Sequence, residues 1–303
     1  MKARTALLAL LGAALVLATM PWLLSDFALS LTLSCLMYTG LAVSWAMFCG
    51  PTHYLSLATS AFFGIGAYVT AWGVGTLAYP VAVLLGGLSA AAFAALVGAA
   101  VLHLRGAYFA VITFGLGELV RHAITYFEKS YAHTVGRVIT DAPEAFTIYF
   151  TVLAVTVAAL GTAILVRASR FGLALAGIGS DEERAQTLGV NARLTKIAGF
   201  TLSAAFAGAL GAAMAVRWTY IEPTSVFNPF IGFQTVLIAM VGGALTLIGP
   251  IVSSVFFSLL TEFLRLQFPY AFLMILGLLL IILVLYLPGG LASLFSRWRK
   301  AHA

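Results

Sequence analysis

Residues 180–190 read Ser180-Asp181-Glu182-Glu183-Arg184-Ala185-Gln186-Thr187-Leu188-Gly189-Val190, a charged and helix-forming run between two long apolar segments. Only 9% of the chain is Asp, Glu, Lys or Arg, so a concentration of these residues in one loop suggests a binding partner outside the lipid. We expect two helical elements and a break at Gly189 within residues 167–196. A loop of that shape offers a docking surface to a soluble protein.

The rest of the chain is dominated by apolar residues. Hydrophobic residues make up 62% of the 303 residues, and the mean hydropathy of +1.06 is far above that of a soluble globular domain. The formal net charge is +6, carried by Lys and Arg in short flanks and in residues 167–196. This distribution follows the positive-inside rule of membrane proteins and does not indicate nucleic-acid binding. We therefore predict a single transmembrane domain over residues 1–303.

The apolar runs predict an all-α polytopic membrane protein. They lie near residues 6–24, 27–49, 55–77, 80–102, 106–127, 146–166, 197–217, 231–264 and 269–287. The run 231–264 is too long for one span and is interrupted at Gly242-Gly243 and Gly249-Pro250. Because both ends of the chain are basic and expected to be cytoplasmic, this run must enter and leave on the same side. About ten transmembrane helices satisfy that rule, and so do eight helices plus a re-entrant hairpin.

Three ionisable residues fall inside the fifth predicted span. Glu118 lies about 18 Å along the helix from its cytoplasmic end near Gly106, at 1.5 Å per residue, which is close to the bilayer midplane. Arg121 follows at i+3 and can pair with Glu118 on one helix face, while His122 lies one turn above Glu118. Intramembrane charges are costly and by default suggest a function. Two interpretations stay open, a functional carboxylate and a self-neutralising pair that holds the halves of a dimer together.

Small residues recur at helical spacing in two of the spans, in Gly64-Ile65-Gly66-Ala67 and in Ala204-x3-Gly208-x3-Ala212. Such patterns let helix backbones approach closely in lipid, where packing replaces the hydrophobic effect. We expect close helix packing at both places. A substrate path lined by small residues is the alternative.

The sequence contains none of the motifs that mark common enzymes or metal sites, namely G-x4-G-K-[ST], H-E-x-x-H, G-x-S-x-G or a Cys/His cluster with metal spacing. Cys35 and Cys49 would lie about 21 Å apart on one helix, too far to form a disulfide with each other. We therefore expect no enzymatic activity, no metal and no cofactor in this chain. If ATP drives the protein, another subunit must hydrolyse it.

Several sequence blocks, in order, resemble the membrane permease family of branched-chain amino acid ABC importers (LivM type), from about Leu41 to Leu291. The first block is Leu55-Ser56-Leu57 with Ala61-Phe62-Phe63-Gly64-Ile65-Gly66-Ala67-Tyr68, and the second is Leu104-Arg105-Gly106-Ala107-Tyr108-Phe109-Ala110 with Thr113 and Glu118. The third is Ser169-Arg170-Phe171-Gly172 with Asp181 to Ala185 and Leu188 to Asn191. The last two are Gly242-Gly243 with Gly249-Pro250, and Pro288-Gly289-Gly290-Leu291. Each block alone is weak, but their shared order and spacing make a strong set. Residues 50–54 and Ala58 depart from the family pattern near the expected path, which leaves the substrate open.

The resemblance implies a type II-like ABC importer permease, a multi-pass protein of the bacterial inner membrane with both termini in the cytoplasm. Such a subunit would translocate branched-chain or related amino acids by alternating access. Its partners would be a second homologous permease subunit (LivH type), two P-loop ATPase subunits that bind ATP and Mg²⁺, a periplasmic substrate-binding protein and membrane lipid, with no nucleic acid. An ion-coupled secondary transporter with Glu118 as its coupling carboxylate is the alternative.

The resemblance also assigns roles to residues. Residues 167–196 become a cytoplasmic ATPase-coupling loop, in which Ser180 to Gly189 forms a short coupling helix. The coupling residues are Ser180, Asp181, Glu182, Glu183, Arg184, Ala185, Leu188 and Gly189. The candidates for the translocation pathway are Phe63, Gly66, Tyr68, Tyr108, Phe109, Thr113, Glu118, Gly242 and Gly243.

Overall fold

The computed structural model describes residues 3–104, 106–139 and 142–269, together with residues 271, 274, 275, 277 and 278. Most of the predicted last span 269–287 lies outside the described residues, as do the 288–291 block, Arg105 and the basic C-terminal tail. The account that follows concerns the described residues.

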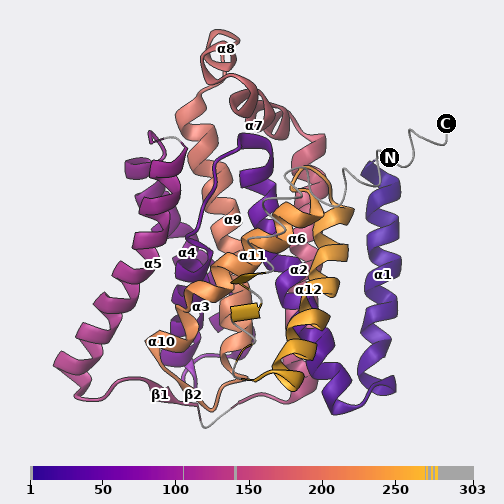
Figure 1. Ribbon diagram of the computed structural model, residues 1–303, viewed down its shortest axis with the longest axis vertical. Helices are drawn as coiled ribbons and strands as arrows, with labels where there is room; N and C mark the ends of the chain where they lie inside the picture. The colour runs from indigo at the N-terminus through magenta and orange to yellow at the C-terminus, as the bar shows by residue number, and fades with distance from the viewer. Residues whose placement is uncertain are drawn as a thin grey trace.

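This part of the chain is a bundle of α-helices (Figure 1). The long helices are α1 (Ala3–Leu23), α2 (Asp26–Thr52), α4 (Tyr79–Val101), α5 (Ala107–Phe127), α6 (Ala145–Ala168), α9 (Ala192–Ala215) and α12 (Ile248–Gln267). The shorter helices are α3 (Thr59–Gly73), α7 (Arg170–Ser180), α8 (Glu182–Thr187), α10 (Pro223–Val226) and α11 (Pro229–Gly242). A π-helical turn, η1 (Glu128–Ala132), and an antiparallel ribbon of β1 (Arg137–Val138) and β2 (Tyr220–Ile221) complete the described elements.

The predicted all-α polytopic membrane architecture is confirmed. Among the described residues, 8 helical segments are long and apolar enough to cross a membrane, with α10 and α11 counted as one segment. Helix α3 has 15 residues and is shorter than the predicted run 55–77, because residues 53–58 form no helix. In this non-helical segment the Ser56 carbonyl accepts from the indole Nε1 of Trp45 at 2.7 Å. Conversely, α9 begins five residues before the predicted run at 197, because the Asn191 side chain caps it by accepting from the Leu194 amide at 3.1 Å.

The two ends of the bundle differ. Helices α7 and α8 lie at one end, here called the α8 end, and β1 and β2 lie at the other, here called the ribbon end (Figure 1). The guanidinium of Arg167, in the last turn of α6, donates to the carbonyls of Ala244, Leu245 and Thr246 at 3.0–3.2 Å. The turn between α11 and α12 therefore lies at the α8 end. The run 231–264 forms two helices that enter and leave at the ribbon end. This agrees with the prediction, made from the basic residues at both chain ends, that the run enters and leaves on the same side.

Helix α9 lies at the centre of the bundle, against α2, α3, α4 and α6. The predicted close packing of small residues occurs here. A Cβ atom on Gly66 of α3 would overlap the carbonyl oxygen of Gly208 of α9, and one on Gly208 would overlap the Cβ of Ala90 of α4. At these positions only glycine allows three helix backbones to approach this closely.

Candidate coupling site and transport path

The predicted coupling segment forms two helices that meet at Asp181. Helix α7 ends at Ser180, and Asp181 is extended, with φ −162° and ψ 107°. The Asp181 carboxylate accepts from the backbone amides of Glu183 and Arg184, each at 3.1 Å, and so begins α8 at Glu182. The expected helix Ser180–Gly189 is therefore shorter at both ends. Gly189 has a φ of +87°, which fits the expected glycine turn after the helix.

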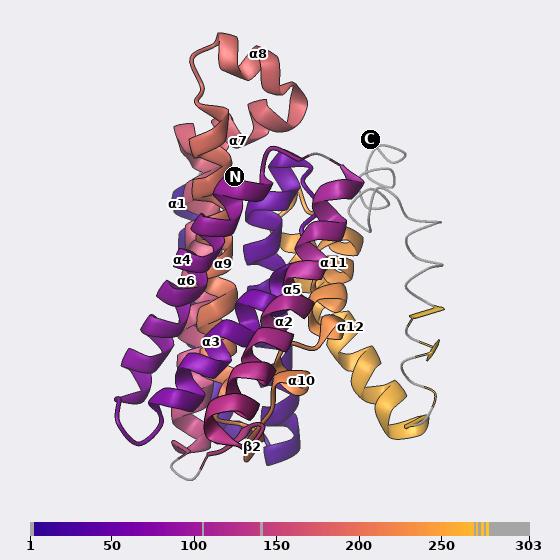
Figure 2. The same ribbon diagram turned by 90° about the vertical axis from the view of Figure 1, so that its left-hand side faces the viewer.

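Helix α8 projects from the end of the bundle (Figure 2). Its inner side holds Ala185, which is buried in a cluster with Ile178 and Ala192. Its outer side holds Glu183, Arg184 and Leu188, and Leu188 is 84% exposed.

Glu182 points the other way, into the bundle. Its Oε1 accepts from Lys196 Nζ of α9 at 2.7 Å, and the two side chains are 12% and 5% exposed. Lys196 Nζ also donates to the Tyr54 hydroxyl at 3.1 Å and to the Leu102 carbonyl, beyond α4, at 3.0 Å. Glu182 therefore anchors α8, a role that the sequence did not separate from that of the other coupling residues. The sequence signal that could have indicated this anchor was Lys196, a lysine at the start of a long apolar run.

A second contact joins α7 to the end of α2. His53, directly after α2, has a left-handed backbone with φ 58°, and its Nδ1 lies 3.1 Å from the Gly179 carbonyl. A Cβ atom on Gly179 would overlap the carbonyl oxygen of Pro51, so the two backbones touch. Together with the Lys196 contacts, this means that the α7–α8 unit rests directly on the ends of α2, α4 and α9.

The pathway candidates are spread over several helix contacts of the described bundle. Phe63, Tyr68, Phe109 and Thr113 are buried side chains within helix contacts, and Gly66 packs on α9. Gly242 packs on Gly249, and Gly243, with φ +88°, ends α11. Tyr108 and Glu118 lie on α5, where Tyr108 is 76% exposed.

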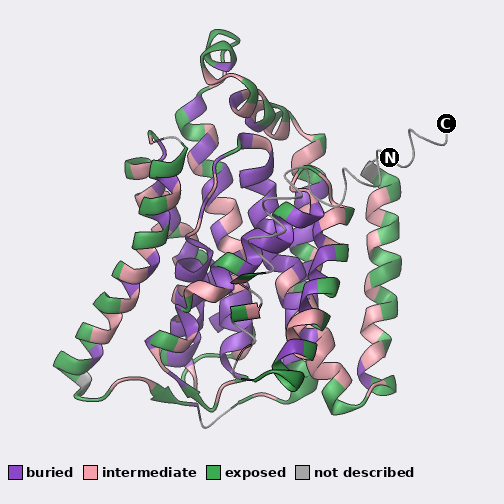
Figure 3. Ribbon diagram, viewed as in Figure 1, coloured by how far each residue is buried: buried purple, intermediate pink, exposed green. Residues whose placement is uncertain are grey.

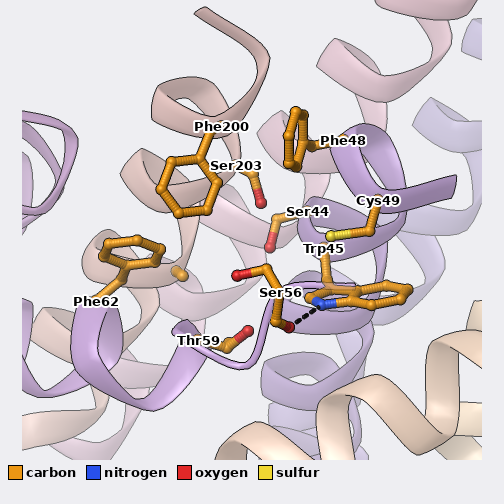
Figure 4. Close-up of a pocket in the computed structure, with 10 residues that line it drawn as sticks. Ser44, Trp45, Phe48, Cys49, Ser56, Thr59, Phe62, Phe200 and Ser203 are labelled. Atoms are coloured by element: carbon orange, nitrogen blue, oxygen red, sulfur yellow. Dashed lines mark hydrogen bonds between the residues drawn. The ribbon is translucent and has the colours of Figure 1, made fainter. Parts of the chain in front are cut away.

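A small cavity lies where α2, α3 and α9 meet (Figure 4). Its lining includes the hydroxyl-bearing residues Ser44, Ser56, Thr59 and Ser203, and it leaves about 10 Å³ for the centre of a water-sized sphere. That space is enough for about one water molecule. The rings of Phe48, Phe62 and Phe200 also line it, and the centroid of the Phe200 ring lies 5.5 Å from that of Phe48 and 5.3 Å from that of Phe62. An amino acid is larger than this space, so it cannot pass between α2, α3 and α9 here.

Glu128 organises the ribbon end. It is 3% exposed, and its Oε2 accepts from the Gly136 amide at 2.8 Å and from the Tyr68 hydroxyl at 3.3 Å. Arg137 of β1 approaches its Oε1 at 4.0 Å and lies over the ring of Trp72 at 5.8 Å. Tyr68, a pathway candidate, therefore holds the loop after α5 onto α3.

The described residues include no group of three His, Cys, Asp or Glu side chains placed to hold a metal ion.

A family model described as "Branched-chain amino acid transport system / permease component" matches residues 27–285. The permease protein LivM of the high-affinity branched-chain amino acid transport system of Escherichia coli (strain K12) is 28% identical, over 93% of the chain and 74% of that protein. Its namesake from Salmonella typhimurium (strain LT2) is 26% identical, over 89% of the chain and 71% of that protein. The nucleoside ABC transporter permease protein NupC of Lactococcus lactis is 28% identical, over 68% of the chain and 66% of that protein. No solved structure matches the chain.

Proposed function

The chain belongs to the family of branched-chain amino acid transport permeases, and from this premise we propose that it is the membrane-spanning subunit of an ATP-driven, binding-protein-dependent importer in a bacterial inner membrane. Two P-loop ATPase subunits, a periplasmic binding protein and a second homologous permease subunit complete the proposed assembly. The solute is a branched-chain or related amino acid. A nucleoside permease among the relatives makes nucleosides the second solute class to test.

The observation that carries this proposal is the α7–α8 unit. Its outer side presents Glu183, Arg184 and Leu188 for an ATPase subunit, and its inner side is fixed by Glu182 and Lys196. The α8 end is proposed to be cytoplasmic, because Arg167, Arg170, Arg184, Arg193 and Lys196 gather in or beside it. Helix α1, which carries Arg4 in its first turn, begins at the same end (Figure 1).

The proposed mechanism is alternating access driven through α8. ATPase closure on bound ATP moves the two coupling loops of the permease pair. In this chain, the Glu182–Lys196 ion pair transmits the motion from α8 to α9, and the bond from Lys196 to the Leu102 carbonyl transmits it to the end of α4. The His53–Gly179 contact transmits the motion from α7 to α2. Because helices are stiff and their packed interfaces have discrete arrangements, a shift at these ends moves whole helices rather than side chains alone.

We expect Leu188→Asp to abolish most ATP-dependent uptake while leaving the amount of folded permease unchanged. Leu188 is exposed, so the substitution removes no contact within this chain, but it places a charge where an ATPase subunit would cover an apolar side chain. Uptake into proteoliposomes and co-purified ATPase are the measurements, and Leu188→Met is the matched control. Normal uptake by Leu188→Asp would contradict the assignment of α8.

The energy source separates this proposal from the ion-coupled alternative. With ATP maintained, we expect uptake to continue after a protonophore collapses the proton gradient and to stop when ATP is withdrawn. A secondary transporter built around Glu118 would behave in the opposite way. The companion measurement is gentle affinity purification from the native membrane. Recovery of a second permease and P-loop ATPases supports the importer, and a lone chain without ATPase would contradict it.

A further inference from the structure

Helix α1 lies at the edge of the bundle, and among residues 4–23 only Pro21 is buried (Figures 1 and 3). It packs on α6. Near the ribbon end, the Tyr149 hydroxyl of α6 donates to the Leu17 carbonyl at 2.8 Å, and the Trp22 ring lies 5.8 and 6.3 Å from two phenylalanine rings of α6. Towards the α8 end, a groove lies between α1 and helices α2, α6 and α12, here called the α1 groove.

The α1 groove is large and apolar. It leaves about 550 Å³ for the centre of a water-sized sphere, which is within the range of small-molecule pockets. Apart from four residues its lining is alanine, leucine, isoleucine and valine. The hydroxyl groups of Thr32, Thr39 and Thr156 in the lining each donate to a backbone carbonyl at 2.7–3.1 Å, and the fourth residue is Cys35. Because water needs several polar partners, a space of this kind holds hydrocarbon rather than water.

The α1 groove extends along one half of the membrane. It reaches from Ala6 to Leu17 on α1 and from Ile248 to Leu259 on α12, which is about 16 Å on each helix at 1.5 Å per residue. Ala6 lies in the first turn of α1 and Ile248 begins α12, so the groove starts at the α8 end. The hydrocarbon core of a bilayer is about 30 Å thick, so the groove has the depth of one leaflet. An acyl chain has this depth, whereas a membrane-spanning helix needs about twice as much.

Two arginines lie where the α1 groove begins. Arg4 is in the first turn of α1, and Arg167 is in the last turn of α6, about one turn beyond the lining residue Ile164. The carbonyls of residues 244–246 that Arg167 binds directly precede the lining residue Leu247. The first turns of α1 and α12 and the last turn of α6 contain no acidic residue. This end of the groove is therefore positively charged, which is the property that attracts anionic lipid head groups between membrane helices.

We propose that the α1 groove binds an anionic phospholipid of the leaflet at the α8 end, with one acyl chain between α1 and α12 and its phosphate near Arg4 and Arg167. An empty groove would leave its lining side chains without contact atoms on one side. The acyl chain supplies those atoms and holds this half of α1 on the bundle. Such a site depends on neither the solute nor the energy source of transport, so it goes beyond the proposed function.

Photo-labelling with a lipid tests the site directly. The full-length permease, with the subunits that co-purify, is placed in nanodiscs of phosphatidylcholine that contain a small, constant fraction of phosphatidylglycerol with a diazirine in the middle of one acyl chain. We expect adducts on lining residues of α1 and α12, identified by peptide mass. Replacing the phosphatidylcholine by unlabelled phosphatidylglycerol should remove these adducts. The matched position is Leu88 on α4, which is 64% exposed and should be labelled equally in both lipids.

Two results would overturn the site. Groove adducts that unlabelled phosphatidylglycerol leaves as strong as those at Leu88 would mean that the groove contacts bulk lipid only. An absence of groove adducts beside normal labelling at Leu88 would mean that another segment of this chain or another protein fills the space.

Filling the α1 groove should prevent binding. Ala14 lines the groove, and Ala14→Phe is expected to lower groove labelling about tenfold, because the ring excludes about two methylene groups of the acyl chain. Leu15→Phe is the matched control, because Leu15 is 71% exposed and lies outside the lining. Equal unfolding temperatures of the two variants in detergent would show that both fold. Labelling of Ala14→Phe at the wild-type level would contradict the site.

The head group is tested separately. Arg4→Gln is expected to lower the preference of the site for phosphatidylglycerol over phosphatidylcholine about fivefold, because one basic residue near the phosphate is removed. Arg193→Gln is the matched control, an exposed arginine near the same end in the first turn of α9. An unchanged preference in Arg4→Gln would show that Arg4 does not bind the phosphate.

A thermal measurement needs no photochemistry. A ligand that binds only the folded protein raises its unfolding temperature. Phosphatidylglycerol added to the delipidated permease in detergent is therefore expected to raise the unfolding temperature of the wild type and of Leu15→Phe, but not that of Ala14→Phe. An equal rise in all three would place the bound lipid elsewhere and overturn the proposal.

Discussion

Lys196→Met is expected to destabilise the α8 end of the protein by about 3 kcal/mol or more, because it leaves the Glu182 carboxylate buried without its cation. Lys196 bonds to three groups, the Glu182 carboxylate, the Tyr54 hydroxyl and the Leu102 carbonyl. Removing it breaks the polar link of α8 to α9 and to the end of α4. We expect a lower unfolding temperature in detergent and loss of ATP-dependent uptake into proteoliposomes.

A double variant separates stability from coupling. In Lys196→Met with Glu182→Met the buried charge is gone, and stability should recover largely, since replacing a whole buried pair by apolar residues is often neutral. Uptake should stay low, because α8 and α9 still lack their bond. Arg184→Met is the matched control for stability alone, because the Arg184–Asp181 pair at the start of the same helix is exposed and should contribute at most about 1 kcal/mol. Full uptake by the double variant would show that the Glu182–Lys196 ion pair transmits no motion.

Gly66→Ala is expected to destabilise the bundle by about 3 kcal/mol or more, because the added methyl group would overlap the carbonyl oxygen of Gly208 on α9. A backbone atom cannot rotate away as a side chain does, so α3 and α9 must separate. Their contact with α4 through Ala90 would be disturbed at the same time. We expect a lower yield of folded protein and a lower unfolding temperature in detergent.

Gly12→Ala is the matched control for this substitution. A Cβ atom on Gly12 of α1 meets nothing within 4 Å, so the variant should gain about 1 kcal/mol from the higher helix propensity of alanine. The two glycine-to-alanine changes are chemically identical and should have opposite signs. Equal unfolding temperatures for Gly66→Ala and the wild type would contradict the close packing of α3 and α9.

The sequence by itself determined the membrane class, the position of most helices, the charged segment at one end and the family. The first three follow from hydropathy and charge read in order along the chain, since a run of apolar residues must cross the lipid as a helix whatever its neighbours are. The family followed from the sequence blocks that resemble it in order and spacing. The basic residues at both ends of the chain also predicted that the run 231–264 returns to the side from which it enters. The close packing of the Gly66 and Gly208 segments was predicted from their spacing alone.

Only the tertiary structure decided which residues act together. Lys196 and Tyr54 are separated by 142 residues, and Tyr68 and Glu128 by 60. Glu182 turned inward and Glu183 outward although the two are adjacent, because the helix cap at Asp181 sets the direction of α8. Periodicity reports which side of a helix is apolar, but a bond between two helices depends on how they pack. That packing is fixed by the whole set of long-range contacts, which no single segment of sequence contains.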